Sequence, residues 1–194
     1  PQFLGLSLAL PLVNIPLMLW IALSPVMLVD ELKLSSLAYG LSQFPVFLGL
    51  IAGNVLLIKV IDRFALGRTV FIGVPIMLCG AFFLLSAVWL PQYALALLLI
   101  GMTLISFGEG ISFSVMYRFA LMSSNVSKGT VAAAVSMLLM LSFFVVIEAV
   151  RWLYTQFHLI AFSGSCVLLL ILWFCYPRKV LKQLLDQRQQ EGLF

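Results

Sequence analysis

The chain has 194 residues, of which 63% are hydrophobic and only 9% are charged, and its mean hydropathy is +1.18. A soluble domain carries about 25% charged residues, so this composition excludes an ordinary water-soluble fold and predicts a membrane protein. The net charge of +4 does not indicate a nucleic-acid partner. In a membrane protein the positions of the basic residues carry more information than their total.

Six stretches are long and apolar enough to cross a bilayer, which takes about 20 residues of helix. In chain order, the expected spans are Phe3–Val29, Leu37–Ile61, Val70–Leu90, Tyr93–Tyr117, Val131–Val150 and Leu159–Tyr176. The connections between them are too short to hold a folded domain. We therefore expect an all-α membrane protein, with a bundle of six transmembrane helices in residues 1–177 and a basic tail in residues 178–194. Because the chain begins with Pro1 rather than Met, we expect it to be part of a longer protein.

The basic residues divide unevenly between the two sides of this bundle. Nine of the eleven fall on the side of the second connection, the fourth connection and the tail: Lys59, Arg63, Arg68, Arg118, Lys128, Arg178, Lys179, Lys182 and Arg188. The other side holds only Lys33 and Arg151. Since cytoplasmic loops are enriched in Lys and Arg, both ends of the chain are predicted to be cytoplasmic.

Glu109 lies about four residues, or ~6 Å, past the midpoint of the fourth span. A carboxyl in hydrocarbon costs at least a few kcal/mol and marks a candidate functional group. No basic residue stands three or four positions away, so we expect this carboxyl to rest mostly protonated. Two roles stay open at this stage. Glu109 either exchanges protons or meets cationic substrates, or it makes a structural hydrogen bond between helices.

Other polar residues of the spans have simpler expected roles. Glu148 and Arg151 are three residues apart near the outer end of the fifth span, a spacing that favours a structural ion pair. Asn14, Gln43 and Asn54 are each expected to hydrogen-bond a neighbouring helix.

Nothing in the sequence points to an enzyme. There is no Walker loop, metal-ligand cluster or nucleophile–base pair. The three cysteines, Cys79, Cys166 and Cys175, lie in apolar runs and are expected to be free thiols. We predict no catalytic residues, no bound metal and no cofactor.

Several short motifs together resemble one family. They are "PLMLWIALSP" in the first span, "YGLSQFPVF" and "IAGNVLL" in the second, "VPIM" in the third, "FGEG" in the fourth and "SKGTV" before the fifth. In this combination the chain resembles the carboxy-terminal half of Bcr/CflA-type multidrug/proton antiporters of the major facilitator superfamily. The resemblance runs almost from end to end. The turn that contains Asp62, Arg63, Gly67 and Arg68 is similar to a stretched form of the superfamily's cytoplasmic-loop motif.

This resemblance implies half of a major facilitator fold, helices seven to twelve, built as a 3+3 inverted repeat. It implies a multi-pass protein of the bacterial inner membrane that exports lipophilic compounds, cationic or neutral, by alternating access, driven by a proton gradient. The missing partner would be the amino-terminal six-helix half. The implied substrate-binding positions are Asn14, Leu17, Met18, Ile21, Ser136, Met140 and Phe143.

Glu109 departs from the family pattern, because the family has an apolar residue at this place in "FGEG". The resemblance therefore assigns it no role. A second reading of the whole chain also stays open. The six helices would then form a non-transporting module, or a half-length product that packs against a partner or a copy of itself.

The charge bias makes a direct prediction about orientation. A cysteine introduced at Gln190 should resist a membrane-impermeant thiol reagent in intact cells, because the tail would be cytoplasmic. A cysteine introduced at Ser35, in the "LKLSS" connection, should react. Cysteine labelling before and after permeabilisation measures both, and the opposite pattern would refute the orientation.

Overall fold

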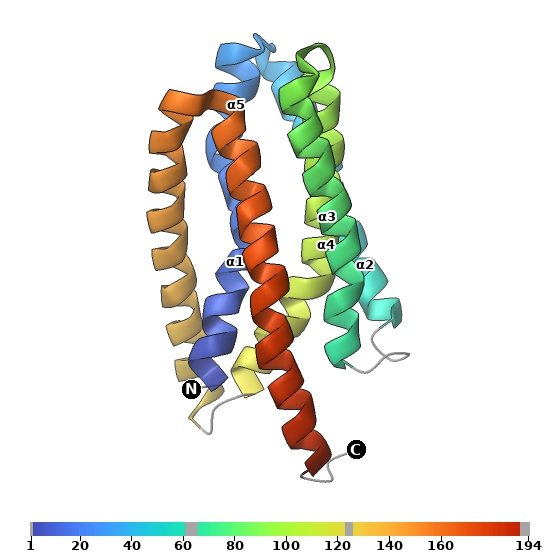
Figure 1. Ribbon diagram of the computed structural model, residues 1–194, viewed down its shortest axis with the longest axis vertical. Coiled ribbons are helices and arrows are strands. Elements are labelled where there is room, and N and C mark those ends of the chain that lie inside the picture. Colours follow the sequence, from blue (N-terminus) through green and yellow to red (C-terminus); the bar gives the residue numbers. More distant parts are fainter. Residues whose placement is uncertain (1, 61–65, 123–125, 191–194) are drawn as a thin grey trace.

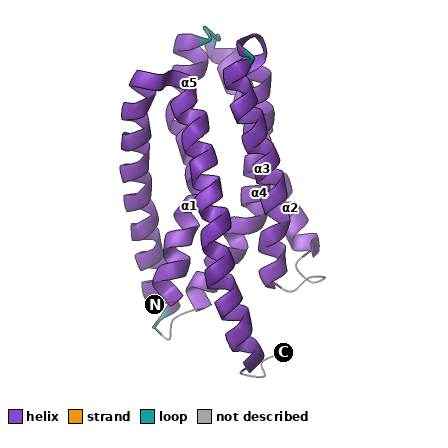
Figure 2. Ribbon diagram, in the orientation of Figure 1, coloured by secondary structure: helices purple, strands orange, loops and turns teal. Residues whose placement is uncertain are grey.

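The computed structural model describes residues 2–60, 66–122 and 126–190, and all the regular elements of that part are helices (Figures 1 and 2). The α-helices are α1 (Gln2–Ser24), α2 (Ser36–Val60), α3 (Leu66–Trp89), α4 (Ala94–Met122) and α5 (Lys128–Gln190). A π-helical stretch, Pro25–Glu31, extends α1, and a short 3-10 turn, Pro91–Tyr93, precedes α4. Asp62 and Arg63 of the predicted loop motif lie outside the described residues. Gly67 and Arg68 belong to the first turn of α3.

The five α-helices provide six crossings because α5 folds back on itself. Its apolar part, Lys128–Cys175, has 48 residues, about 72 Å of helix, whereas the hydrocarbon core is about 30 Å thick. The backbone turns at His158, where φ is 47° and ψ is −129°. Residues 128–157 form a first arm and residues 159–190 a second arm, which Figure 1 shows side by side and running in opposite directions.

Two predicted connections are shorter than expected. The sequence placed a non-helical connection at residues 151–158, and this was wrong, because α5 stays helical up to its turn at His158. The stretch "RWLYTQF" is polar enough to lower the hydropathy but contains no Gly or Pro that would end a helix. For the same reason α4 continues past Tyr117 to Met122. The helix of the second arm also continues beyond Tyr176, to Gln190.

Proline changes the carboxy-terminal end of the first predicted span. Pro25 has no backbone N–H and removes one helical hydrogen bond. The chain continues as a wider helix, in which the Leu32 amide donates to the Met27 carbonyl five residues earlier, at 3.1 Å. The predicted span, which ended at Val29, therefore reaches Glu31.

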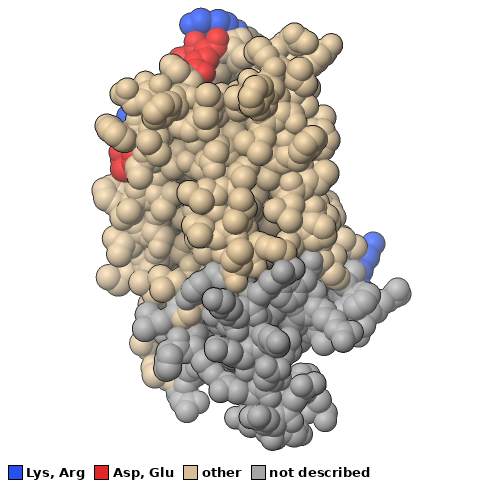
Figure 3. Space-filling model, in the orientation of Figure 1, with Lys and Arg blue, Asp and Glu red and all other residues tan. Residues whose placement is uncertain are grey.

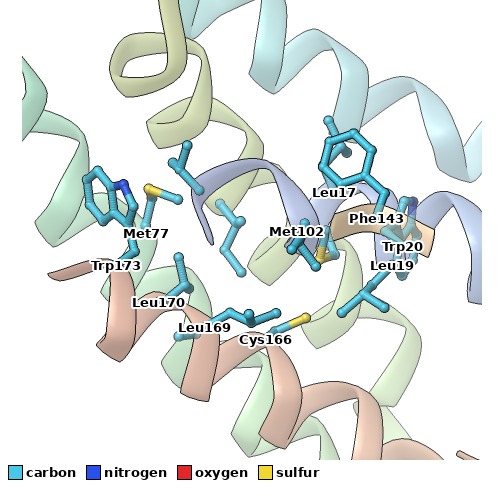
Figure 4. Close-up of a cluster of buried hydrophobic side chains, with 14 of the residues drawn as sticks. Leu17, Leu19, Trp20, Met77, Met102, Phe143, Cys166, Leu169, Leu170 and Trp173 are labelled. Atoms are coloured by element: carbon cyan, nitrogen blue, oxygen red, sulfur yellow. The ribbon is translucent and has the colours of Figure 1, made fainter. Parts of the chain in front are cut away.

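The six crossings pack as two groups of three. One group is α2, α3 and α4, and the other is α1 with the two arms of α5. α2 and α3 pack mainly on α4, whereas both arms of α5 belong to the helix that packs mainly on α1. α1 and α4 also contact each other and so join the groups. This arrangement fits the 3+3 repeat that the sequence led us to expect. Figure 4 shows part of the shared core, to which Met77 of α3, Met102 of α4, Leu17 of α1 and Leu169 and Leu170 of the second arm all contribute.

The outer surface is apolar. Figure 3 shows Lys, Arg, Asp and Glu near the edges of the described face, with a broad belt between them that carries none. Large side chains such as Phe82 and Phe144 are each 67% exposed. Such a surface suits lipid or a further apolar partner, and it confirms the membrane-protein class that the composition predicted.

Glycine allows α4 to lie close to α2 and α3. The Gly49 and Gly53 pair of α2 rests against the backbone of α4. A Cβ on Gly49 would stand 2.6 Å from the Thr103 carbonyl oxygen, and one on Gly53 would run into the Phe107 carbonyl. These contacts are with backbone atoms, which cannot move aside without moving the helix.

We therefore expect Gly53→Ala to push α2 away from α4 and to lower the free energy of unfolding by about 1–3 kcal/mol. The matched control is Gly40→Ala on the same helix, where an added Cβ meets nothing within 4 Å. Thermal unfolding of the purified full-length protein in detergent measures both. Equal melting temperatures for the two variants would contradict the close packing described here.

Candidate functional site

An acid and an amide meet in the interior of the bundle. Glu109 of α4 is 1% exposed. The Asn14 side chain of α1 donates from Nδ2 to Glu109 Oε1, over 2.5 Å. Spacing along α4 does not reveal this partner, because it belongs to another helix and lies 95 residues away in the chain.

The two glycines beside Glu109 explain the "FGEG" motif. A Cβ on Gly108 would stand 2.7 Å from the Gly73 carbonyl oxygen of α3, and a Cβ on Gly110 would stand 2.5 Å from the Leu50 carbonyl oxygen of α2. α4 is therefore closely flanked by α3 and α2 on either side of Glu109. The carboxyl itself reaches toward α1, whose Asn14 lies between Pro11 and Pro16.

The two oxygens of the carboxyl have different surroundings. Oε1 accepts the amide hydrogen bond, whereas Oε2 is buried and has no hydrogen-bond partner in the described part of the chain. Buried polar atoms are normally paired, so an unpaired carboxyl oxygen is a candidate site for a proton. Among the acids whose side chains the structure describes, the same is true of no other, because Asp30, Glu31 and Glu148 are exposed.

Two further polar contacts join helices, as the sequence predicted for Gln43 and Asn54. Trp20 Nε1 of α1 donates to Gln43 Oε1 of α2 over 2.8 Å. The Ser114 hydroxyl of α4 donates to Asn54 Oδ1 of α2 over 3.0 Å, and Asn54 Nδ2 donates to the Leu50 carbonyl of its own helix. The contribution of Trp20 was missed, because an indole in an apolar run carries no signal in sequence.

The end of the bundle at which α5 turns holds the charged contacts. Arg151 and Glu148 lie 3.8 Å apart, the ion pair that their spacing predicts, and both side chains are more than half exposed. His158 Nδ1 stands 3.1 Å from Glu31 Oε1, so the turn of α5 contacts the end of the first crossing. These groups lie far along the chain from Glu109, and no contact joins them to it in the described residues.

The predicted substrate positions separate into two sets. Leu17 and Phe143 are buried in the core between α1 and α5, and Figure 4 labels both. Met18 is half-buried, while Ile21 is 43% and Met140 64% exposed. Ser136 is also exposed. An apolar groove of about 320 Å³ lies elsewhere, on α2, and none of the predicted positions lines it.

The chain is similar to several known drug-resistance and drug-transport proteins. Over 192 residues the chain is 68% identical to the chloramphenicol resistance protein CraA of Acinetobacter baumannii, which covers 99% of this chain. It is 35% identical to the multidrug resistance protein MdtM of Salmonella typhimurium over 89% of the chain, and 37% identical to the multidrug transporter MdfA of Escherichia coli over 76%. Nearly the whole chain is therefore similar to part of these drug-resistance and drug-transport proteins. The search against protein-family models found no match.

The matches cover less of the relatives than of this chain. The chain spans 46% of CraA, 43% of MdtM and 36% of MdfA, so it corresponds to about half of such a protein.

Proposed function

We propose that this chain is the carboxy-terminal half of a proton-coupled multidrug efflux transporter. The observation that carries the proposal is the match of nearly the whole chain to proteins named for drug resistance and drug transport. The transporter would export lipophilic compounds, cationic or neutral, by alternating access across the bacterial inner membrane. A chloramphenicol-like neutral compound is a first candidate substrate, because the relative at 68% identity is named for resistance to chloramphenicol.

The partner of this half would be an amino-terminal six-helix half of the same protein. The chain spans about half the length of its relatives, and two of its helices carry long exposed apolar rows. On α2 the row contains Leu41, Phe44 and Leu48, and on the first arm of α5 it contains Met137 and Phe144. A second half that closes over part of this surface would place the substrate between the halves, near the midplane.

The exposed set of predicted positions would form this half's side of the binding site. Met140 and Ser136 are four residues apart on the first arm, so they share one face of the helix. Methionine adapts to ligands of varied shape, which suits lipophilic drugs better than sugars. No catalytic role is proposed, and the energy for transport would come from the proton gradient.

Filling this surface tests the binding site. Met140→Trp adds bulk to a side chain that is 64% exposed, and it should lower resistance to large lipophilic compounds while membrane abundance stays unchanged. Leu168→Trp is the matched control, because Leu168 is 58% exposed but lies on the second arm of α5. The two variants are compared by measuring drug resistance in cells that express the full-length protein. Unchanged resistance to every compound for Met140→Trp would mean that this face meets lipid.

Glu109 is the proposed proton or cation group of this half. It is the buried acid among those whose side chains the structure describes, and one of its oxygens is unpaired. An acid at this depth can bind a proton from one side and release it to the other as the transporter changes conformation. The structural alternative, a carboxyl that only links α1 to α4, makes a different prediction for the same substitution.

We expect Glu109→Gln to impair export of cationic drugs and to spare neutral ones. Glutamine keeps the shape and can accept the Asn14 hydrogen bond, but it cannot ionise. Glu148→Gln is the control, because it removes an exposed acid from an ion pair at the outer end. Drug efflux and proton release by the full-length protein are measured across pH. Wild-type behaviour of Glu109→Gln at every pH, for both drug classes, would end the proton-carrier role.

A further inference from the structure

Asn14 is placed to control the proton chemistry of Glu109. Its Nδ2 atom donates to Oε1 of the carboxyl, whereas Oε2 is buried and unpaired in the described residues. The two groups belong to different helices, α1 and α4, so their separation depends on how these helices pack. Asn14 is the polar side chain of α1 that contacts the acid, and it lies between two prolines, Pro11 and Pro16.

The chemistry of the pair follows from these contacts. An amide N–H donates more strongly to a carboxylate than to a neutral acid, because hydrogen bonds to charged groups are the stronger ones. The Asn14 hydrogen bond therefore favours the ionised form of Glu109, while burial favours the protonated form. Since Oε1 is occupied by the amide, the proton of the acid form resides on Oε2.

We propose that Asn14 is a positioning residue that sets the pH at which Glu109 exchanges its proton, and that Oε2 is the oxygen that binds and releases it. This rests on the proposed function of Glu109 in transport. Asn14 would not carry the proton itself. It would hold the carboxyl in one orientation and keep the ionised form accessible at a depth where ionisation is otherwise costly.

No other titratable group of the neighbouring helices is joined to Glu109 by a contact that the structure describes, so the effect is assigned to Asn14. α1 has no charged residue between Gln2 and Ser24. Among groups whose side chains the structure describes, the remaining candidates on the packed helices are Tyr39 and Lys59 of α2, Cys79 of α3, and Lys128, Glu148, Arg151, Tyr154, His158, Cys166 and Cys175 of α5. The charged ones lie toward helix ends, and no ion pair or hydrogen bond joins any of these groups to Glu109 in the described chain. The uncharged ones, the three thiols and the hydroxyls of Tyr39 and Tyr154, do not supply a charge that would replace the amide.

The test uses the reconstituted full-length transporter and two readouts. The first is the pH dependence of export of a lipophilic cationic dye. The second is the infrared signal of a protonated carboxyl, assigned to Glu109 by its loss in Glu109→Gln. Asn14→Leu should move the midpoint of both curves upward, because the ionised form loses its donor. Asn14→Gln, which keeps the amide, should bring the midpoint back toward the wild-type value.

Two controls separate this effect from a general change in the bundle. Ser24→Ala removes another contact of α1, the 3.3 Å pairing of Ser24 with the Tyr39 hydroxyl, and it should leave both midpoints unchanged. Asn14→Leu should also have no effect on the pH dependence when Glu109 is already Gln. If Asn14→Leu does not accumulate in the membrane, Asn14→Ala makes the same comparison with a smaller side chain.

The outcomes distinguish this proposal from the one on which it rests. An unshifted carboxyl signal in Asn14→Leu or Asn14→Ala overturns the role of Asn14, whatever the transport data show. The same pH shift in the Glu109→Gln background also overturns it. If Glu109→Gln exports every drug normally while Asn14→Leu still shifts the carboxyl signal, the role of Asn14 stands and the coupling of Glu109 to transport fails.

Discussion

The absence of water from the hydrocarbon core is the constraint on which the rest of this structure depends. Backbone amides and carbonyls must be paired inside the protein, and a helix is the way a single segment achieves this. Where proline interrupts the pattern, at Pro25, the chain changes to a wider helix and still pairs the Leu32 amide with the Met27 carbonyl. The same constraint acts on side chains, so Asn14, Gln43 and Asn54 each find a partner on another helix.

Close packing is the second consequence. Lipid tails are as apolar as the helices, so burial alone does not hold the helices together and contact must do so. Gly49 and Gly53 of α2 meet the backbone of α4, while Gly108 and Gly110 let α4 approach α3 and α2. The glycines around Glu109 thus have a packing role. They bring α2 and α3 close on two sides of α4, and the carboxyl extends toward α1 instead. The position of the acid is set by its neighbours as much as by its own chemistry.

Much of this fold could be predicted from the sequence, because hydropathy reports directly on a requirement of the bilayer. The six crossings and the ion pair of Glu148 with Arg151 follow from length and spacing. The ends of the helices could not be predicted as well, since residues 151–157 are polar without containing a helix breaker. The pairing of Asn14 with Glu109 could not be predicted at all, because it joins residues 95 positions apart. Such contacts depend on which faces of α1 and α4 meet, and periodicity is weak in helices that are apolar all round.

The position of Asn14 on α1 links the acid to the proposed binding surface. Leu17, Met18 and Ile21 follow Asn14 by three, four and seven residues, so all four lie along one face of the helix. Leu17 packs in the core and Ile21 is exposed, so this face leads from the buried carboxyl toward the surface.

A ligand that contacts Met18 or Ile21 would act on the same helix that holds Glu109 Oε1. The prolines on either side of Asn14 lower the cost of a small bend there. A bend that draws Asn14 away would remove the hydrogen bond that favours the ionised acid. Occupancy of the binding surface and protonation of Glu109 would then be coupled through one short segment of α1, without a direct contact between drug and proton.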